Sequence, residues 1–144
     1  MSASIGMAND SHRVVLDSNI LISAYVFGGK PEAVFKLVIT EKIQGITSQI
    51  LISEFLDVLR KKFAVSQSEI IEIQNEMQEV FEIVYPSKTL HIVKDEPDNR
   101  VLEAAVEGRC KYIITGDSQL LNLGIFKNIK IVTADQFLKS VFKG

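Results

Sequence analysis

The sequence predicts an α/β fold with three layers, in which helices cover both faces of a central, mainly parallel, five-stranded sheet. Two observations predict it: short apolar segments alternate with helix-like segments along the whole chain, and the linkers between them are short. Such alternation is typical of parallel strands joined by helical crossovers. Since no long linker or change of composition divides the chain, we expect a flexible lead-in at residues 1–12 and one domain at residues 13–144.

Five segments have the length and the apolar content of buried strands. In the first, Val14, Val15 and Leu16 are apolar without alternation, which is typical of a strand covered on both faces. The others are similarly short and are bounded by polar residues or glycine. The predicted strands are residues 14–16, 43–48, 90–93, 111–115 and 130–133.

Helix-like segments separate these strands, and several have recognisable ends. The pair Gly28-Gly29 breaks the first helix, and Pro31 suits the first turn of the second, where a missing N–H costs nothing. Ser48 is a favoured residue for the start of the third, and Gly108 ends the fifth. The predicted helices are residues 19–27, 31–42, 48–63, 66–84, 98–109, 118–123 and 134–142.

Composition excludes several classes of protein. The chain has 144 residues and a formal net charge of -2, which argues against a strongly cationic nucleic-acid binder but leaves room for a local basic patch. A single cysteine, Cys110, permits no internal disulfide and fits a reducing cytoplasm, where we expect the protein to reside. No apolar run approaches the roughly 18–20 residues of a membrane span, and the N-terminus lacks the pattern of a secretory signal.

Acidic residues follow three of the predicted strands. Asp17, Asp98 and Asp117 each stand just beyond a strand, where the functional groups of parallel sheets gather. Each also precedes a predicted helix, so each alone has the simpler interpretation of a helix cap. A fourth acid, Glu54, lies among apolar helical neighbours that should face the core. Four converging carboxylates would repel one another, and a divalent cation removes that conflict. Oxygen ligands without His or Cys favour Mg²⁺ or Mn²⁺.

The same residues carry a resemblance to a known family. The segments "VVLDSNILISAYVF", "TSQILISEFLDVL", "KDEPDNRVLEAA" and "KYIITGDSQLLNL", followed by "IVTADQFL", resemble the PIN domain from about residue 13 to residue 141. They are most similar to the single-domain prokaryotic PIN proteins described as toxin components of toxin–antitoxin systems. The resemblance implies a compact α/β/α fold, Mg²⁺- or Mn²⁺-dependent ribonuclease activity and, as in many members, a homodimer.

Carried over residue by residue, the resemblance identifies four catalytic and metal-binding acids. The family's first acid, in its D-[ST]-N signature, falls on Asp17, and its helix acid falls on Glu54. The third falls on Asp98, and the fourth, in T-G-D, on Asp117. We expect Asp17 and Asp98 to be primary ligands, with Asp117 sharing a metal or binding it through water and Glu54 binding a second metal or orienting the attacking water. Supporting residues that hold carboxylates or waters would be Ser18, Asn19, Asp95, Asn99 and Thr115.

One position departs from the family pattern. Many relatives have D-P-D-D-N where this chain has Asp95-Glu96-Pro97-Asp98-Asn99, so Pro97 replaces an acid. The third site therefore carries less negative charge. Asp98 is retained, as is Asp95, an outer acid in this interpretation, so we expect an active site.

The predicted partners follow from the same resemblance. RNA is the expected substrate, and a small antitoxin protein would occlude the acidic pocket. Binding of RNA requires positively charged side chains that neutralise its phosphates. The basic end of the 48–63 helix is a weak candidate for this role, with Arg60, Lys61 and Lys62. The apolar stripe of the 66–84 helix serves either the core or a homodimer interface.

Two other functions fit parts of the sequence. In a haloacid-dehalogenase-like phosphatase, Asp17 would be the nucleophile that becomes phosphorylated. Such enzymes require a second Asp two residues later, where this chain has Asn19. A catalytically inactive PIN-like dimer that binds RNA or protein is the other alternative, to which the departure at Pro97 gives some support.

Overall fold

The protein has an α/β fold built on one six-stranded sheet. The structure, a computed structural model, describes residues 12–142. The strand order is β3-β2-β1-β4-β6-β5, and every pair is parallel except β5 with β6. The strands are β1 (Arg13–Leu16), β2 (Gln44–Ser48), β3 (Glu82–Val84), β4 (Tyr112–Ile114), β5 (Ile125–Phe126) and β6 (Ile129–Val132).

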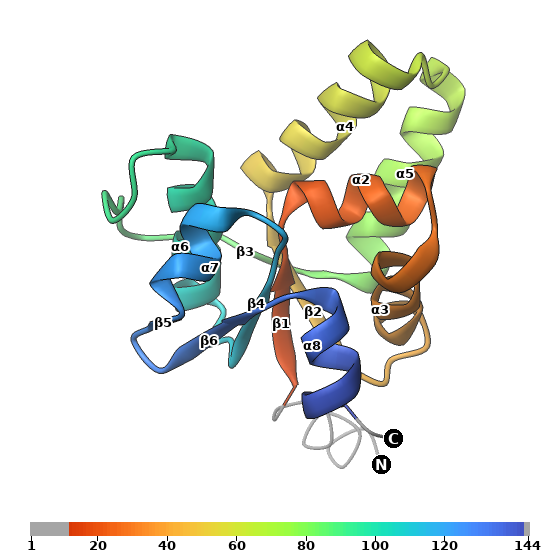
Figure 1. Cartoon of the computed structure of the whole chain (residues 1–144). Helices are drawn as coiled ribbons and strands as arrows, with labels where there is room; N and C mark the ends of the chain where they lie inside the picture. The colour runs from red at the N-terminus through yellow and green to blue at the C-terminus, as the bar shows by residue number, and fades with distance from the viewer. Residues whose placement is uncertain (1–11, 143–144) are drawn as a thin grey trace, which may run out of the picture.

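Helices cover both faces of this sheet (Figure 1). On one side lie α2 (Ser18–Val26), α3 (Gly29–Ile39), α4 (Gln49–Phe63), α5 (Gln67–Val80), α8 (Ala134–Gln136) and the π-helical turn η1 (Phe137–Val141). On the other lie α6 (Glu96–Glu107) and α7 (Ser118–Leu123). The three-layer architecture predicted from the sequence is therefore confirmed.

The two faces have separate hydrophobic cores because strand residues alternate between them. Val14 and Leu16 of β1 pack into the larger core with α2 to α5, whereas Val15 packs into the smaller core with α6 and α7. The stripe on α5, which includes Ile70 and Met77, is buried in the larger core. In the described part of the chain, no helix has both the length and the apolar character to span a membrane.

The central strands fix where the site forms. β1 pairs with β4 in a register that sets Leu16 opposite Ile114, so the residues just after both strands emerge side by side. The backbone N–H of Asp17 continues the ladder by donating to the carbonyl of Ile114 at 3.2 Å. Crossover helices leave from this same edge, which is where ligands bind in open α/β sheets.

One predicted strand is wrong. Residues 90–93 form no strand and belong to the irregular segment between β3 and α6. Their backbone N–H groups bind side chains of α6: Leu90 donates to Glu103 at 2.8 Å, and Ile92 and Val93 donate to Asn99 at 2.9 and 3.0 Å. The edge of the sheet beside β2 is instead occupied by β3, within a segment that the sequence assigned to the end of a helix.

The sheet also has one strand more than predicted. β5 is two residues long and pairs antiparallel with β6 through a tight turn at Lys127 and Asn128, both with positive φ. Such a short strand carries almost no periodicity for sequence analysis to detect. The predicted lead-in at residues 1–12 lies, except for His12, outside the described residues, as do residues 143 and 144 of the predicted domain.

Candidate functional site

A pocket at the carboxyl ends of β1 and β4 brings the four predicted acids together. Its volume is about 170 Å³. Asp17 and Asp117 approach it from the sheet, Asp98 from α6 and Glu54 from α4. The residues that line it are Asp17, Ser18, Asn19, Glu54, Val58, Asp95, Pro97, Asp98, Val101 and Asp117.

Asp17 and Asp117 both cap helices, as their simpler interpretation required. Asp17 Oδ1 accepts the backbone N–H of Ile20 at 3.0 Å, and Asp117 Oδ2 accepts that of Leu120 at 3.1 Å. Each cap uses one carboxylate oxygen and fixes the side chain at the start of α2 or α7. Capping and clustering are thus compatible, because both helices begin at the same edge of the sheet.

Thr115 joins these two acids. Its side chain is buried, its hydroxyl donates to Asp17 Oδ2, and its oxygen accepts the backbone N–H of Asp117 at 2.9 Å. Thr115 directly follows β4, so the pairing of β1 with β4 sets it beside Asp17. The predicted supporting role of Thr115 agrees with this geometry.

We expect Thr115→Val to reduce the free energy of unfolding by about 1–3 kcal/mol, because a buried carboxylate oxygen loses its donor while the side-chain volume is kept. Urea denaturation of both proteins measures the difference. Thr40→Val is the matched control, since the exposed Thr40 hydroxyl donates only to carbonyls at the end of α3. Equal destabilisation by both substitutions would contradict the role of Thr115.

Asp98 is one of two buried acids of the pocket whose pKa is raised. Its side chain is buried, and Oδ2 has no hydrogen-bond partner among the described residues. Burial, together with the nearby carboxylates of Asp117, Asp95 and Asp17, raises the pKa of Asp98 to about 8. It comes from the first turn of α6, not from a strand end as the sequence predicted. The loop that replaces the expected strand still delivers it to the same place.

Burial also raises the pKa of Asp17. The hydrogen bonds from Thr115 and Ile20 act in the opposite direction, while the charges of Asp117 and Glu54 add to the rise. Both buried acids therefore lie in a site that penalises negative charge. Such a site favours a compensating cation.

Asp95, Asp98 and Asp117 form the tightest group. One carboxylate oxygen from each lies within 4.8 Å of the others, a spacing that suits a shared metal ion. Asp95 occupies the N-cap position of α6, yet its side chain makes no capping hydrogen bond. From the sequence, Asp95 is expected only as an outer acid. Its place in the same helical turn as Asp98 was the available signal for a closer role.

The chemistry of this pocket fits a hard divalent cation. All of its charged groups are carboxylates, and among the described residues no lysine or arginine lines it. Asp98 Oδ2 offers an oxygen ligand to which no donor within residues 12–142 makes a hydrogen bond. Carboxylate oxygens without His or Cys suit Mg²⁺ or Mn²⁺ better than zinc. Asp17 and Glu54 complete the negative lining.

The other supporting residues divide into two groups. Ser18 donates its hydroxyl to Glu54 Oε1 at 2.8 Å, and thereby fixes that carboxylate across the pocket from α6. The exposed Asn19 lines the pocket. Asn99 serves the loop instead: its side chain accepts from Ile92 and Val93 and donates to the Val93 carbonyl at 2.8 Å. It holds α6 and the preceding segment together.

The predicted basic end of α4 lies partly beside the acids. Lys61 and Lys62 line a shallow depression that continues along α4 to Glu54. Arg60 is absent from that lining and forms an ion pair with Asp57. Lys61 and Lys62 are therefore better placed than Arg60 to meet a molecule bound at the acidic pocket.

Comparison with known proteins places this site in a family. The family model of the PIN domain matches residues 13–119, a range that contains all five acids of the pocket. An uncharacterized protein of Methanocaldococcus jannaschii is 31% identical over 116 residues, covering 77% of this chain and 74% of the relative. PIN domains are generally metal-dependent nucleases that act on nucleic acids. This match agrees with the fold and with the acidic pocket. The chain belongs to the PIN domain family.

Proposed function

We propose that this protein is a Mg²⁺- or Mn²⁺-dependent endoribonuclease, with its active site in the acidic pocket. The observation that carries the proposal is the convergence of five carboxylates on one pocket that no described lysine or arginine lines. A divalent cation bound there would activate water and neutralise charge on a phosphodiester. The haloacid-dehalogenase-like alternative has less support, because Asn19 stands where such an enzyme needs its second aspartate.

The residues of the pocket have different roles in this proposal. Asp95, Asp98 and Asp117 would hold the cation, because their oxygens lie closest together. Asp17, fixed by Thr115, contributes a further ligand or directs a coordinated water. Glu54 keeps one oxygen free of the Ser18 hydrogen bond, so it orients the attacking water and accepts its proton.

The finer parts of the proposal rest on the family resemblance. They are RNA as the substrate, a toxin-like role with a small antitoxin as partner, a homodimer and a cytoplasmic location. The inactive binding module remains the alternative function, and Pro97 is the departure in its favour. Intact acids at the other positions favour an enzyme.

A nuclease assay with defined oligonucleotides tests the proposed activity. We expect end-labelled single-stranded RNA to be cut in Mg²⁺ or Mn²⁺ and to stay intact in EDTA. Single-stranded DNA of the same sequence distinguishes a ribonuclease from a general nuclease. RNA that binds without being cut under any metal condition would favour the inactive module.

Lys61 and Lys62 supply a second, quantitative prediction. We expect the double variant Lys61→Ala/Lys62→Ala to bind single-stranded RNA more weakly. The slope of log K for association against log salt should become less negative by about 0.7 for each phosphate that the protein no longer neutralises. Fluorescence anisotropy from about 50 to 200 mM salt measures that slope. Arg60→Ala is the matched control, because Arg60 already pairs with Asp57. An unchanged slope in the double variant would remove these lysines from the binding surface.

A further inference from the structure

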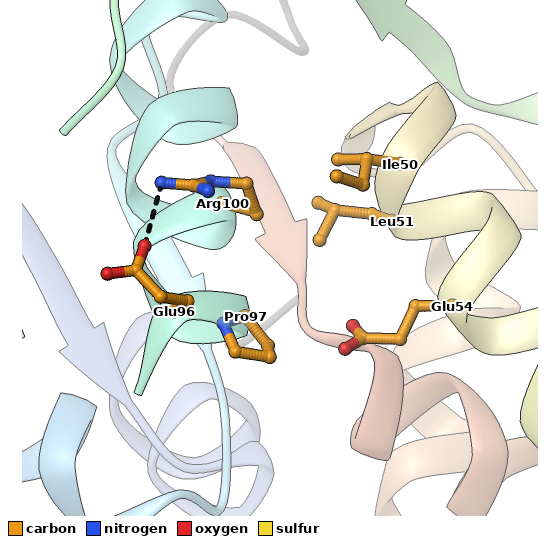
Figure 2. Close-up of a pocket in the computed structure, with 6 residues that line it drawn as sticks. All are labelled: Ile50, Leu51, Glu54, Glu96, Pro97 and Arg100. Carbon is orange, nitrogen blue, oxygen red and sulfur yellow. Dashed lines mark ion pairs between the residues drawn. The ribbon is translucent and has the colours of Figure 1, made fainter. Parts of the chain in front are cut away.

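A second cavity adjoins the acidic pocket and has a different chemistry. It has a volume of about 200 Å³ and lies between α4 and α6 (Figure 2). It shares Glu54 and Pro97 with the acidic pocket, so these two residues separate two adjacent cavities. We call it the interhelical slot, and its lining residues are Ile50, Leu51, Glu54, Glu96, Pro97 and Arg100.

The facing walls of the interhelical slot are apolar. Ile50 and Leu51 extend from α4 toward α6, where Pro97 and the aliphatic stem of Arg100 face them (Figure 2). Leu51 is buried, whereas Ile50 keeps 54% of its surface exposed. A large aliphatic side chain left half-exposed on a cavity wall is available to pack against a ligand.

Arg100 gives the slot no free positive charge. Its Nη2 pairs with Glu96 at 3.3 Å and Glu103 at 2.8 Å, and also donates to the Leu90 carbonyl at 3.1 Å. The guanidinium points away from Ile50 and Leu51, so mainly the stem of Arg100 faces them (Figure 2). Glu54 adds negative charge at the slot, whereas the Glu96 carboxylate pairs with Arg100 away from Ile50 and Leu51 (Figure 2). The slot therefore disfavours a phosphate and favours an uncharged group.

The volume of the slot favours a small ligand, such as a single ring system. Pockets for drug-sized ligands are roughly 300–1,000 Å³, so a cavity of about 200 Å³ suits something smaller. Enzymes that act on nucleic acids hold extruded bases in small pockets between apolar or aromatic side chains.

The covalent structure of a nucleic acid indicates which ligand the slot would bind. If a phosphodiester lies at the acidic pocket, as the proposed function requires, the attached nucleotide must place its base close by. The slot begins at Glu54 and Pro97, two residues of that same pocket. We propose that the interhelical slot receives the unpaired base of a nucleotide next to the scissile phosphate, which makes the substrate single-stranded at that position. This inference rests on the proposed nuclease function.

An abasic scan of the substrate tests the proposal. A single-stranded RNA 12-mer that the wild-type protein cleaves is made with one abasic residue at each position in turn. We expect one abasic position, adjacent to the cleaved bond, to lower kcat/KM about tenfold, since base stacking contributes on that order. A duplex of the same sequence should be cut poorly. Uniform cleavage across the scan would overturn the proposal.

A protein variant locates the effect in the slot. We expect Ile50→Ser to lower kcat/KM about tenfold on the full RNA but to leave the rate unchanged on the sensitive abasic RNA, because both changes remove the same interaction. Ile71→Ser on α5 is the matched control: Ile71 has 48% of its surface exposed and does not line the slot. Additive losses from Ile50→Ser and the abasic residue would contradict the assignment.

A binding measurement separates this inference from the proposed function. RNA with 2-aminopurine at the sensitive position, or at each position in turn if no cleavage occurs, is titrated with the Asp98→Asn variant. Entry into an aliphatic slot unstacks the base, so we expect its fluorescence to rise, and to rise less when Ile50→Ser is added. If Ile50→Ser changes neither cleavage nor binding, the assignment of the slot alone would be overturned. A protein side chain would then be the expected occupant of the slot. Absence of RNA binding would overturn both proposals.

Discussion

Replacing Asp98 by asparagine should reduce metal-dependent RNA cleavage by about 10²-fold or more without preventing folding. Asp98 is buried, its Oδ2 has no partner among the described residues, and its carboxylate lies next to those of Asp95 and Asp117. Asparagine keeps the shape of the side chain but removes the charge that would hold a cation. Loss of one preorganised group in an active site costs several kcal/mol of transition-state stabilisation.

The measurement is kcat/KM on single-stranded RNA at saturating Mn²⁺, with far-ultraviolet circular dichroism and thermal melting to establish folding. Glu79→Gln is the matched control, because Glu79 is an exposed acid of α5 outside the pocket. A folded Asp98→Asn protein that cleaves as fast as the wild type would refute the assignment of the active site.

The second large effect is on stability as a function of pH. Without metal, the stability of the folded protein should fall as the pH rises from about 4 to about 8. The pKa of Asp98 is raised from 3.8 to about 8, chiefly by burial, so the folded state holds a proton that the unfolded state releases across this range. The state that binds more protons loses relative stability as the pH increases. The raised pKa of Asp17 acts in the same direction.

A shift of one pKa unit between the folded and unfolded states corresponds to about 1.4 kcal/mol of stability. Solvent screening makes the effect of the full Asp98 shift smaller than this conversion gives. We therefore expect the metal-free wild type to lose at least about 1.4 kcal/mol, relative to Asp98→Asn, between pH 5 and pH 8. That loss is about 3–6 °C in Tm for a chain of this size. Calorimetry of both proteins in EDTA measures it, and parallel pH profiles would show that Asp98 titrates normally.

Mn²⁺ should restore the lost stability at pH 8. A ligand that binds only the folded state at 100 times its Kd adds about 2.7 kcal/mol. The gain should be much smaller in Asp98→Asn, and it should be smaller for the wild type at pH 5, where protons compete for the same oxygens. An identical Mn²⁺ response in both proteins would place the metal elsewhere.

Short-range patterns were sufficient to predict most of the fold. The apolar run at Val14 to Leu16 followed by Asp17 specified both the central strand and the first acid of the pocket, because each depends on neighbouring residues alone. The predicted cap at Ser48 and the helix end at Gly108 are confirmed for the same reason. Their places after the strands also predicted that Asp17, Asp98 and Asp117 converge, and the resemblance to PIN domains then assigned metal-binding roles to the acids.

The errors occurred where distant residues determine the local structure. "LHIV" at residues 90–93 has the composition of a strand, but Asn99 and Glu103 take up its backbone N–H groups. Glu82–Val84 continues a helix in pattern, yet pairing with β2 makes it a strand. The position of Asp95 depends on that misassigned loop. No pattern in the neighbouring residues reveals such contacts.

The pairing of β1 with β4 also determines when the acidic pocket can form during synthesis of the chain. Asp17 is made early, but the hydroxyl that holds it belongs to Thr115, and Asp117 follows two residues later. A ribosome must therefore translate as far as Asp117 before the pocket can close. Nascent chains that stop short of β4 lack both Thr115 and Asp117, so the proposed metal site is incomplete until both residues have been made.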